Sequence, residues 1–344
     1  MPDKFAKIFA GLAWCGLRER EDMKMRTIGT GMLAGLLGGV ALGCVSLAGM
    51  TGTAVAKAPE YTFAMITHAQ PGDTFWDIIR KGAEAAAKKD HVKLVYLNNP
   101  NASGEAQLIT NVTQQHVDGI AATLAFPDAE DPALAQAEKA GIPVVGFNAG
   151  TSEWKKAGML MYVGEDETIA GEAVGDRLNT LGAKHVLVVD QQQGAIQLED
   201  RGDGIKKTFK GKVSVLYVDG YDMAGAQSRI VAKLQQNRDI DYVVTLGAPF
   251  APTAIQAVKM ANSKAKVATF DLNPQAVHLI QEGKLQFAVD QQPYVQGYEA
   301  VDFLWLYKTN GDVVGGGKPV LTGPTFVTSK NVAAVAKFAE RGTR

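Results

Sequence analysis

Short apolar runs alternate with amphipathic stretches from Tyr61 onward, and this alternation occurs in two successive rounds. The first round has strand-length runs, rich in β-branched residues, at 61–67, 92–97, 118–124 and 142–147. The second round has runs at 184–190, 213–219, 242–246 and 266–271, with helical patterns near 167–181, 199–209, 224–237 and 252–262. Strands that alternate with helices indicate βαβ units and a parallel sheet. The pattern predicts an α/β chain with two similar Rossmann-like lobes, which the length of 344 residues allows.

The last part of the chain is expected to join the two lobes. A strand at 286–291 and a helix to about residue 310 precede two short apolar runs, 319–321 and 325–327. A chain that returns to its first lobe there connects the lobes by several strands, which makes a multi-strand hinge. We place the first crossover at 159–164. We expect a first lobe of residues 61–163 with about 291–321, and a second lobe of 164–290 with about 322–344.

The first 56 residues have the pattern of a secretory signal peptide. An apolar, glycine-rich stretch at 28–50 follows Lys24 and Arg26 and is followed by Ala54-Val55-Ala56. A basic segment, an apolar segment and a small-x-small site predict cleavage after Ala56 and export to the periplasm. A transmembrane anchor is the alternative, since the stretch is nearly long enough to span a bilayer.

Both cysteines, Cys15 and Cys44, precede this cleavage site. The mature chain is then expected to contain no thiol and no disulfide. Cys44 follows Ala41-Leu42-Gly43, a loose version of a lipoprotein box, so a lipid anchor at Cys44 is a second alternative. The residues before Met23 fit no signal pattern, and as a hypothesis translation starts at Met23 or Met25 and the earlier residues are a spurious extension.

Composition and motifs argue against several function classes. Lys and Arg number 35 against 36 Asp and Glu, and no basic patch interleaved with aromatics follows, so nucleic-acid binding is not expected. The chain has no G-x-S-x-G elbow and no Walker loop, and Gly202-Asp203-Gly204 does not follow a strand as a dinucleotide loop would. The five histidines lack metal-ligand spacing. We therefore expect a protein that is not an enzyme, with no cofactor and no metal site.

The candidate ligand-binding residues follow the predicted strands, because ligands of open parallel sheets bind beyond the carboxyl ends of the strands. Carboxylates and amides hydrogen-bond hydroxyl groups, and aromatic rings stack on the apolar face of a sugar, so this set suits a neutral ligand with many hydroxyls. The residues in these places are His68, Asp73, Phe75, Trp76, Asn148, Gln191 to Gln193, Asp222, the 248–250 turn, Asp271 and Gln291.

Structural roles compete with the binding role at several of these positions. Asp73, Asp190 and Asp271 could each be a helix cap or an Asx-turn residue. Phe75 is in phase with the apolar stripe of its helix, whereas Trp76 lies off it, so we expect Trp76 to be exposed toward a cleft.

Arg201 is a further candidate for binding. It is expected near the start of the helix at 199–209. The helix dipole disfavours a cation there, which favours a functional role over that of a solvated helix charge.

Taken together, these segments resemble the periplasmic sugar-binding proteins of the ribose/galactose type, which share their fold with the ligand domain of the lactose-repressor group. The similarity covers residues 61–327, and the order and spacing of its motifs are more specific than any one of them. The motifs are Asp73-Thr74-Phe75-Trp76 with Gly82; Gly141-Ile142-Pro143-Val144-Val145-Gly146-Phe147-Asn148; Val163-Gly164-Glu165-Asp166 with Gly171; Arg201-Gly202-Asp203-Gly204; Thr269-Phe270-Asp271; and Asp290-Gln291-Gln292-Pro293 with Gly297.

The resemblance implies a type I periplasmic binding protein fold and specific ligand contacts. Asp73 would contact sugar hydroxyls, Phe75 and Trp76 would stack on the ring, and the remaining hydrogen bonds would come from Asn148, Arg201, Asp271 and Gln291. Ribose-binding relatives have an aspartate where this chain has Asn148, an arginine in place of Ala149 and an asparagine in place of Ala248. These differences disfavour D-ribose itself and leave another pentose, a hexose, a polyol or a similar small hydroxylated ligand.

The resemblance further implies a monomeric substrate-binding protein that delivers its ligand to the membrane permease and ATPase of an ABC importer. A chemosensory or signalling-molecule binding protein of the same fold is the alternative. A secreted sugar-cleaving enzyme is a third hypothesis. It would need two carboxylates, such as Asp73 and Asp271, facing each other about 5 to 10 Å apart.

Overall fold

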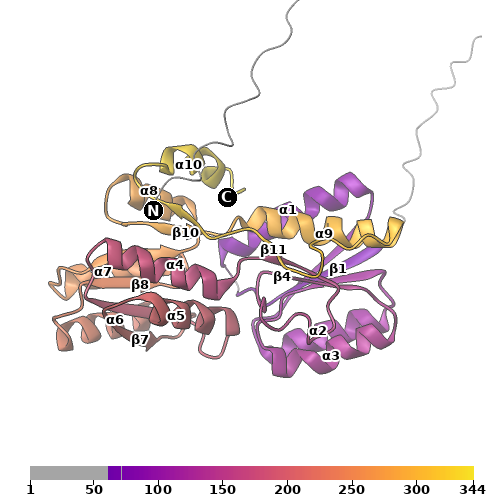
Figure 1. Ribbon diagram of the computed structural model, residues 1–344, viewed down its shortest axis with the longest axis horizontal. Helices are drawn as coiled ribbons and strands as arrows, with labels where there is room; N and C mark the ends of the chain where they lie inside the picture. The colour runs from indigo at the N-terminus through magenta and orange to yellow at the C-terminus, as the bar shows by residue number, and fades with distance from the viewer. Residues whose placement is uncertain (1–60, 71) are drawn as a thin grey trace, which may run out of the picture. The chain divides into compact units, whose positions relative to one another are not determined.

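The computed structural model describes residues 61–70 and 72–344, all of which belong to one compact unit. The predicted signal peptide and Cys44 lie outside the described residues. Within the described part, two six-stranded sheets each form the centre of a lobe, with helices on both faces (Figure 1). The chain is thus an α/β protein of two lobes, as predicted. None of the helices described from residue 61 onward is long and apolar enough to cross a bilayer.

The first lobe is built on a parallel sheet with the strand order β11-β5-β4-β3-β1-β2. Its strands are β1 (Thr62–Thr67), β2 (Lys93–Asn98), β3 (Gly119–Ala122), β4 (Val144–Phe147), β5 (Met161–Gly164) and β11 (Val320–Leu321). Its helices are α1 (Thr74–Asp90), α2 (Ala102–Gln114), α3 (Pro127–Lys139) and α9 (Pro293–Asn310). Helices α1 and α9 cover one face of the sheet, and α2 and α3 cover the other (Figure 1).

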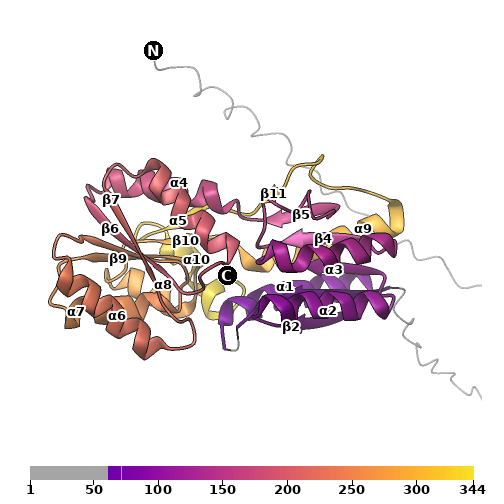
Figure 2. The same ribbon diagram turned by 90° about the horizontal axis from the view of Figure 1, so that it is seen from below.

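The second lobe repeats this arrangement with the strand order β12-β10-β9-β8-β6-β7, in which only β12 is antiparallel to its neighbour. Its strands are β6 (His185–Asp190), β7 (Lys212–Tyr217), β8 (Tyr242–Thr245), β9 (Lys266–Phe270), β10 (Ala288–Asp290) and β12 (Thr325–Val327). Its helices are α4 (Glu167–Thr180), α5 (Ile196–Thr208), α6 (Met223–Gln236), α7 (Phe250–Met260), α8 (Pro274–Gln281) and α10 (Val332–Glu340). Helices α4 and α5 lie on the opposite side of the sheet from α6 and α8 (Figure 2).

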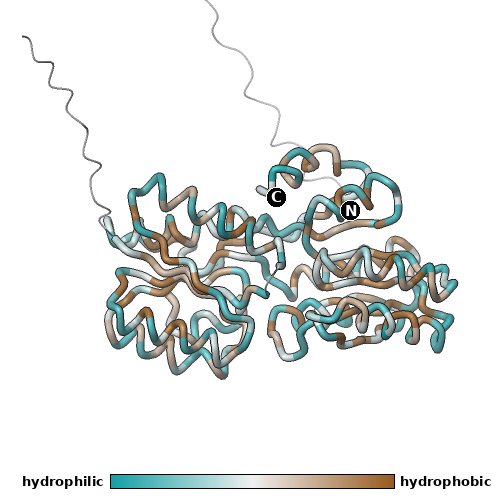
Figure 3. Tube along the Cα trace, turned by 180° about the vertical axis from the view of Figure 1, so that it is seen from behind, coloured by the Kyte–Doolittle hydropathy of each residue, from teal (hydrophilic) through white to brown (hydrophobic). Residues whose placement is uncertain are grey.

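The hydrophobic pattern of each strand and helix matches its place in these layers of helix, sheet and helix. The central strands are buried over their whole length, because both faces of a parallel sheet are covered by helices. The helices alternate between hydrophobic and hydrophilic residues along the trace (Figure 3). An apolar stripe of this kind turns one side of each helix to its sheet.

The chain crosses between the lobes three times: after β5, after β10, and between β11 and β12. The predicted first crossover at 159–164 is wrong, because Met161–Gly164 is strand β5 of the first sheet and pairs with β4. No helix separates β4 from β5, so the strand–helix alternation stops there although the lobe continues. The expected return of the chain is confirmed, since β11 pairs with β5 in the first sheet and β12 with β10 in the second.

Candidate functional site

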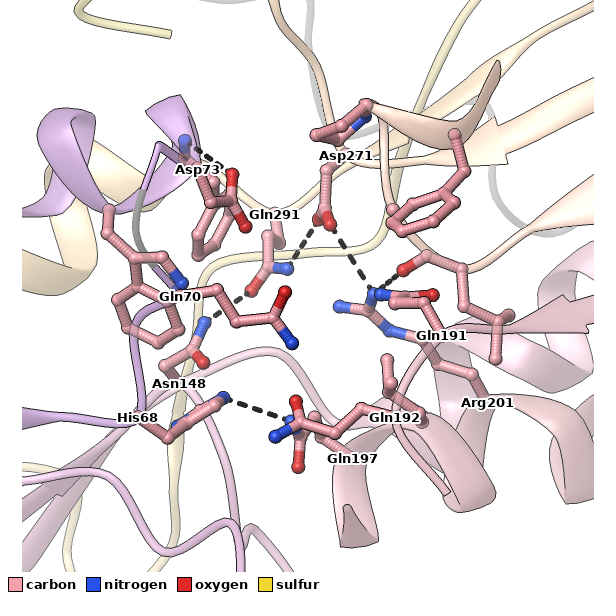
Figure 4. A pocket seen from close by; sticks show the side chains of 17 residues that line it. His68, Gln70, Asp73, Asn148, Gln191, Gln192, Gln197, Arg201, Asp271 and Gln291 are labelled. Carbon is pink, nitrogen blue, oxygen red and sulfur yellow. Dashed lines mark hydrogen bonds and ion pairs between the residues drawn. The ribbon is translucent and has the colours of Figure 1, made fainter. Parts of the chain in front are cut away.

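A pocket lies at the carboxyl ends of the strands of both sheets, and all seven predicted ligand-binding residues line it (Figure 4). First-lobe residues in this lining directly follow β1 and β4, and second-lobe residues directly follow β6 and β9. The lining residues that the structure describes are His68, Gln70, Asp73, Phe75, Trp76, Asn148, Gln191, Gln192, Gln197, Leu198, Arg201, Leu246, Gly247, Pro249, Phe250, Asp271 and Gln291.

Asn148 and Asp271 occupy equivalent places in the two lobes. Each follows a completely buried phenylalanine, Phe147 or Phe270, at the end of the fourth strand of its sheet. Each also has a left-handed backbone, with φ of 64° and 65° respectively. Asn and Asp are the non-glycine residues that enter this region most readily, and such strain concentrates at functional sites. The turn directs both polar side chains into the pocket (Figure 4).

Arg201 is buried on α5 and is held by carboxylates from two other elements. Its Nε donates to Glu167 Oε2 at 2.5 Å, its Nη2 donates to Glu167 Oε1 at 3.2 Å, and its Nη1 lies 3.5 Å from Asp271 Oδ2. The guanidinium also lies 4.7 Å from the centre of the Phe270 ring. Burial by itself lowers the pKa of Arg201, but the charges of Glu167 and Asp271 outweigh it and raise the pKa. The arginine therefore stays charged in one fixed orientation.

The position of Arg201 within its helix differs from the prediction. Helix α5 begins at Ile196, so Arg201 lies in its second turn and not near its start. The argument from the helix dipole is therefore wrong, since the dipole acts mainly on the first turn. The helix starts earlier than predicted because its N-cap residue, Ala195, has no side chain that could mark the boundary.

A chain of amide hydrogen bonds leads from Asp271 to the first lobe. Gln291 Nε2 donates to Asp271 Oδ1 at 2.6 Å, and Asn148 Nδ2 donates to Gln291 Oε1 at 3.2 Å. Gln296 Nε2 donates to the same Oε1 at 2.8 Å, and its own Oε1 accepts from Asn148 Nδ2 at 3.0 Å. These bonds fix which end of each amide is the donor. They also join the pocket to the crossing segment after β10.

Asp73 is both a helix cap and a pocket residue. It is the N-cap of α1, and its Oδ1 accepts from the backbone N–H of Phe75 at 3.0 Å. Burial raises the pKa of Asp73 to about 6, although the Phe75 N–H opposes the rise. Of the other two aspartates in question, Asp190 accepts from the Gln192 N–H, as in an Asx turn, whereas the side chain of Asp271 caps no helix.

Phe75 and Trp76 are both core residues of the first lobe. They are 9% and 7% exposed, and both belong to the apolar cluster between the sheet and the helices α1 and α9. The expectation that Trp76 is exposed toward the cleft is therefore wrong for most of its surface. The Trp76 ring packs edge-on against the rings of His68 and Phe75, so the buried face of α1 is wider than the single stripe that periodicity reveals. The parts that remain accessible line the pocket.

Sequence reasoning missed several contributors to the site, among them Glu167 and Gln197. Glu167, the main partner of Arg201, comes from the first turn of α4 and lies 34 residues away in the chain, so no local pattern links the two. Gln197 lines the pocket from the first turn of α5, which lies outside the predicted helix. Within residues 61–344 as described, no group of three His, Cys, Asp or Glu side chains is placed to hold a metal ion.

Several solved structures share this fold. A carbohydrate transporter protein from Acidothermus cellulolyticus 11B, solved in complex with myo-inositol, is 60% identical and has a TM-score of 0.82, covering 83% of this chain and 100% of that one. A solute-binding protein of an ABC transporter from Burkholderia graminis C4D1M, solved with D-arabinose, is 27% identical with a TM-score of 0.72, covering 80% of this chain and 98% of that one.

Curated relatives are more distant in sequence. The ribose import binding protein of Haemophilus influenzae is 26% identical over 231 residues, which are 65% of this chain and 77% of that protein. The xylose/arabinose-binding protein of Sulfolobus acidocaldarius is 26% identical over 237 residues, which are 63% of this chain but only 58% of that protein.

The profile of a protein family matches residues 63–312, which is well over half of the chain. The description of this family is a periplasmic binding protein domain, and its members bind ligands without catalysis. The matched region includes strands of both lobes and most of the residues that line the pocket. The chain therefore belongs to the periplasmic binding protein domain family and is a binding protein with the type I fold, not an enzyme.

Proposed function

We propose that this chain is the substrate-binding protein of an ABC importer and that it captures a neutral, polyhydroxylated ring, a monosaccharide or a cyclitol such as myo-inositol. The pocket lining is the observation that carries the proposal. It consists mostly of amides, carboxylates and aromatic rings, and Arg201 is the single Lys or Arg side chain among the lining residues that the structure describes. Its charge is already matched by Glu167 and Asp271. An anionic ligand would find no uncompensated cation there.

The identity of the ligand class is supported by the 60% identical relative, which was solved with myo-inositol. Hydroxyl groups both donate and accept hydrogen bonds, so a ring of hydroxyls suits a lining that mixes carboxylates with amides. The two alanines that argue against D-ribose, Ala149 and Ala248, are buried and do not line the pocket. They offer the ligand no polar group.

In this proposal the seven predicted residues have distinct roles. Asp73 and Asp271 accept hydrogen bonds from ligand hydroxyls, and Arg201 donates to a hydroxyl oxygen. Asn148 and Gln291 are held by each other and present their remaining polar atoms to the ligand. Phe75 and Trp76 cover an apolar face of the ring.

We also propose that the mature protein is a periplasmic monomer that begins after Ala56 and docks on a permease that is coupled to an ATPase. Export is supported by the basic and apolar segments before Ala54-Val55-Ala56. The proposed lobe limits are 61–163 with about 291–321, and 164–290 with about 322–344, of which the first falls one residue before the end of β5. Mass spectrometry of the exported protein tests the cleavage, and a diacylated Cys44 would contradict it.

Titration calorimetry with myo-inositol, D-arabinose, D-ribose and myo-inositol 1-phosphate tests the ligand class. We expect at least one neutral ring to bind with a micromolar or lower dissociation constant, and the phosphate ester to bind at least tenfold more weakly than its parent. Tighter binding of the phosphate ester would overturn the neutral-ligand proposal. Uptake of the labelled ligand by cells with and without the gene then separates import from sensing, since a purely sensory protein leaves uptake unchanged.

A further inference from the structure

The two lobes contact each other directly on the side of the pocket where β1 and β3 meet the start of α5. Gln197 Nε2 on α5 lies 3.0 Å from His68 Nε2, which follows β1 (Figure 4). The backbone N–H of Ile196 donates to the carbonyl oxygen of Ala125 at 3.1 Å. Phe126, next to Ala125, packs on the apolar cluster of the second lobe. All three contacts lie outside the three crossing segments.

The hydrogen bond between Ile196 and Ala125 supplies an acceptor for the uncapped start of α5. The first N–H groups of a helix have no partner within the helix, and Ala195 has no side chain that could cap them. The Ala125 carbonyl of the other lobe accepts from the first of these N–H groups. Separating the lobes would break this bond and leave the start of α5 without it.

The hydrogen bonds around His68 determine which of its ring nitrogens carries the proton. The Thr123 hydroxyl donates its single proton to Glu105 Oε1. Its oxygen therefore accepts from the His68 backbone N–H at 3.2 Å and from His68 Nδ1 at 2.9 Å. Nδ1 must carry a hydrogen in this arrangement, so Nε2 of a neutral ring is an acceptor for the amide of Gln197.

We propose that the His68–Gln197 and Ala125–Ile196 hydrogen bonds form an interlobe latch, in which Thr123 sets the Nδ1–H form of His68 and the latch slows release of the ligand. His68 and Gln197 are positioning residues in this role, because they act by holding the lobes together. The effect on release builds on the proposed binding function. The His68 tautomer is set by Thr123 within the first lobe and needs no ligand, whereas the two interlobe bonds belong to the closed arrangement of the lobes.

The His68 ring itself does not titrate near neutrality. Burial, with a contribution from the charge of Arg201, lowers the pKa of His68 to about 3, so the ring stays neutral. Behind Thr123, burial raises the pKa of Glu130 on α3 to about 7 and that of Glu105 on α2 well above its usual range. Glu105 Oε1 remains an acceptor for Thr123 whether or not the other oxygen is protonated. On the α1 side, Asp73 lines the same pocket, and burial raises its pKa to about 6, close to the lower end of the pH range of the test.

The variant Gln197→Glu tests the latch, because it places a carboxylate acceptor opposite His68 Nε2, which is itself an acceptor. Closure then requires uptake of one proton, so affinity must fall as the pH rises. With myo-inositol as the probe between pH 6.5 and 8.5, we expect the wild-type affinity to change less than about threefold and that of the variant to fall about tenfold or more. Stopped-flow measurements should place this loss in a faster dissociation rate. Gln235→Glu, an exposed matched change on α6, should follow the wild type.

Two further measurements keep the latch testable by itself. Gln197→Ala should dissociate faster than wild type with no added pH dependence, which covers a failure of Gln197→Glu to fold. Nitrogen-15 NMR of the ligand-free protein should show His68 protonated at Nδ1 alone. An Nε2–H ring, or parallel pH profiles for Gln197→Glu and wild type, would overturn the latch. Failure of the wild type to bind any neutral ring would instead overturn the proposed function and leave the NMR test valid.

Discussion

At the scale of single residues, Asn148 and Asp271 form matching left-handed turns that line the pocket from the two lobes. Both were predicted because each directly follows a strand, where the carboxyl edge of a parallel sheet presents polar groups. The sequence does not reveal their left-handed backbone or their link through Gln291, since both depend on packing across the lobes. The burial of Trp76 depends on packing as well, because its ring meets the rings of His68 and Phe75 edge-on within the apolar cluster of the first lobe.

Asp271→Ala is expected to weaken ligand binding by about 2 to 4 kcal/mol, roughly 30- to 1,000-fold, because ligand hydroxyls and the Arg201 guanidinium lose a buried acceptor. Alanine also strains the left-handed backbone, at a cost of about 1 to 2 kcal/mol in the free energy of unfolding. Asp271→Asn is the matched control, since asparagine tolerates this backbone. It should keep the wild-type unfolding free energy to within about 1 kcal/mol and still lose affinity. Calorimetry that finds Asp271→Ala within threefold of wild type would remove Asp271 from the site.

A Trp76→Ala variant cannot serve as a simple test of ring stacking. Trp76 packs in the core of the first lobe, so the truncation should reduce the free energy of unfolding by about 3 to 5 kcal/mol.

At the scale of elements, the position of Arg201 depends on how closely α4 and α5 approach each other. A Cβ on Gly171 of α4 would lie 2.3 Å from the backbone oxygen of Arg201, and one on Gly204 of α5 would lie 2.4 Å from the oxygen of Thr168. Glycine at these places lets the two helices touch, which brings Glu167 of α4 onto the guanidinium. Helical periodicity predicted both helices, but their spacing follows from contacts that a single-helix pattern does not contain.

Gly171→Ala is therefore expected to separate α4 from α5 and displace Arg201. We expect the free energy of unfolding to fall by about 1 to 3 kcal/mol, because overpacking outweighs the better helix propensity of alanine. Affinity for myo-inositol should fall about tenfold, equivalent to about 1.4 kcal/mol. Gly202→Ala is the matched control on α5, since a Cβ there meets nothing within 4 Å. It should be neutral or stabilising in denaturant unfolding, and equal behaviour of the two variants would contradict this account.

At the scale of the whole molecule, three crossing segments connect the two lobes, and a few side chains link these segments to one another. Gln292 Nε2 donates to the backbone carbonyl oxygen of Thr322 at 2.7 Å. This bond links the crossing segment after β10 to the one between β11 and β12. Arg344 Nε donates to Asp290 Oδ2 at 2.6 Å beside them. The sequence predicted a connection by several segments but took 159–164, which contains β5, as the first crossing, because β5 follows a loop and not a helix. Rotation about these short segments would leave both sheets intact.

We accordingly expect ligand binding to shift the protein from an open to a closed arrangement of rigid lobes. The ligand contacts both lobes in the closed state alone, so it stabilises that state by its full differential affinity. Small-angle X-ray scattering should show a smaller radius of gyration with saturating myo-inositol than without it. The circular dichroism spectrum should stay the same, since no element refolds. Gln197→Ala should reach the same closed radius at a higher ligand concentration, because it weakens the interlobe contact without touching the crossing segments. Identical scattering curves with and without bound ligand would exclude lobe closure and assign the binding energy to a site that is already closed.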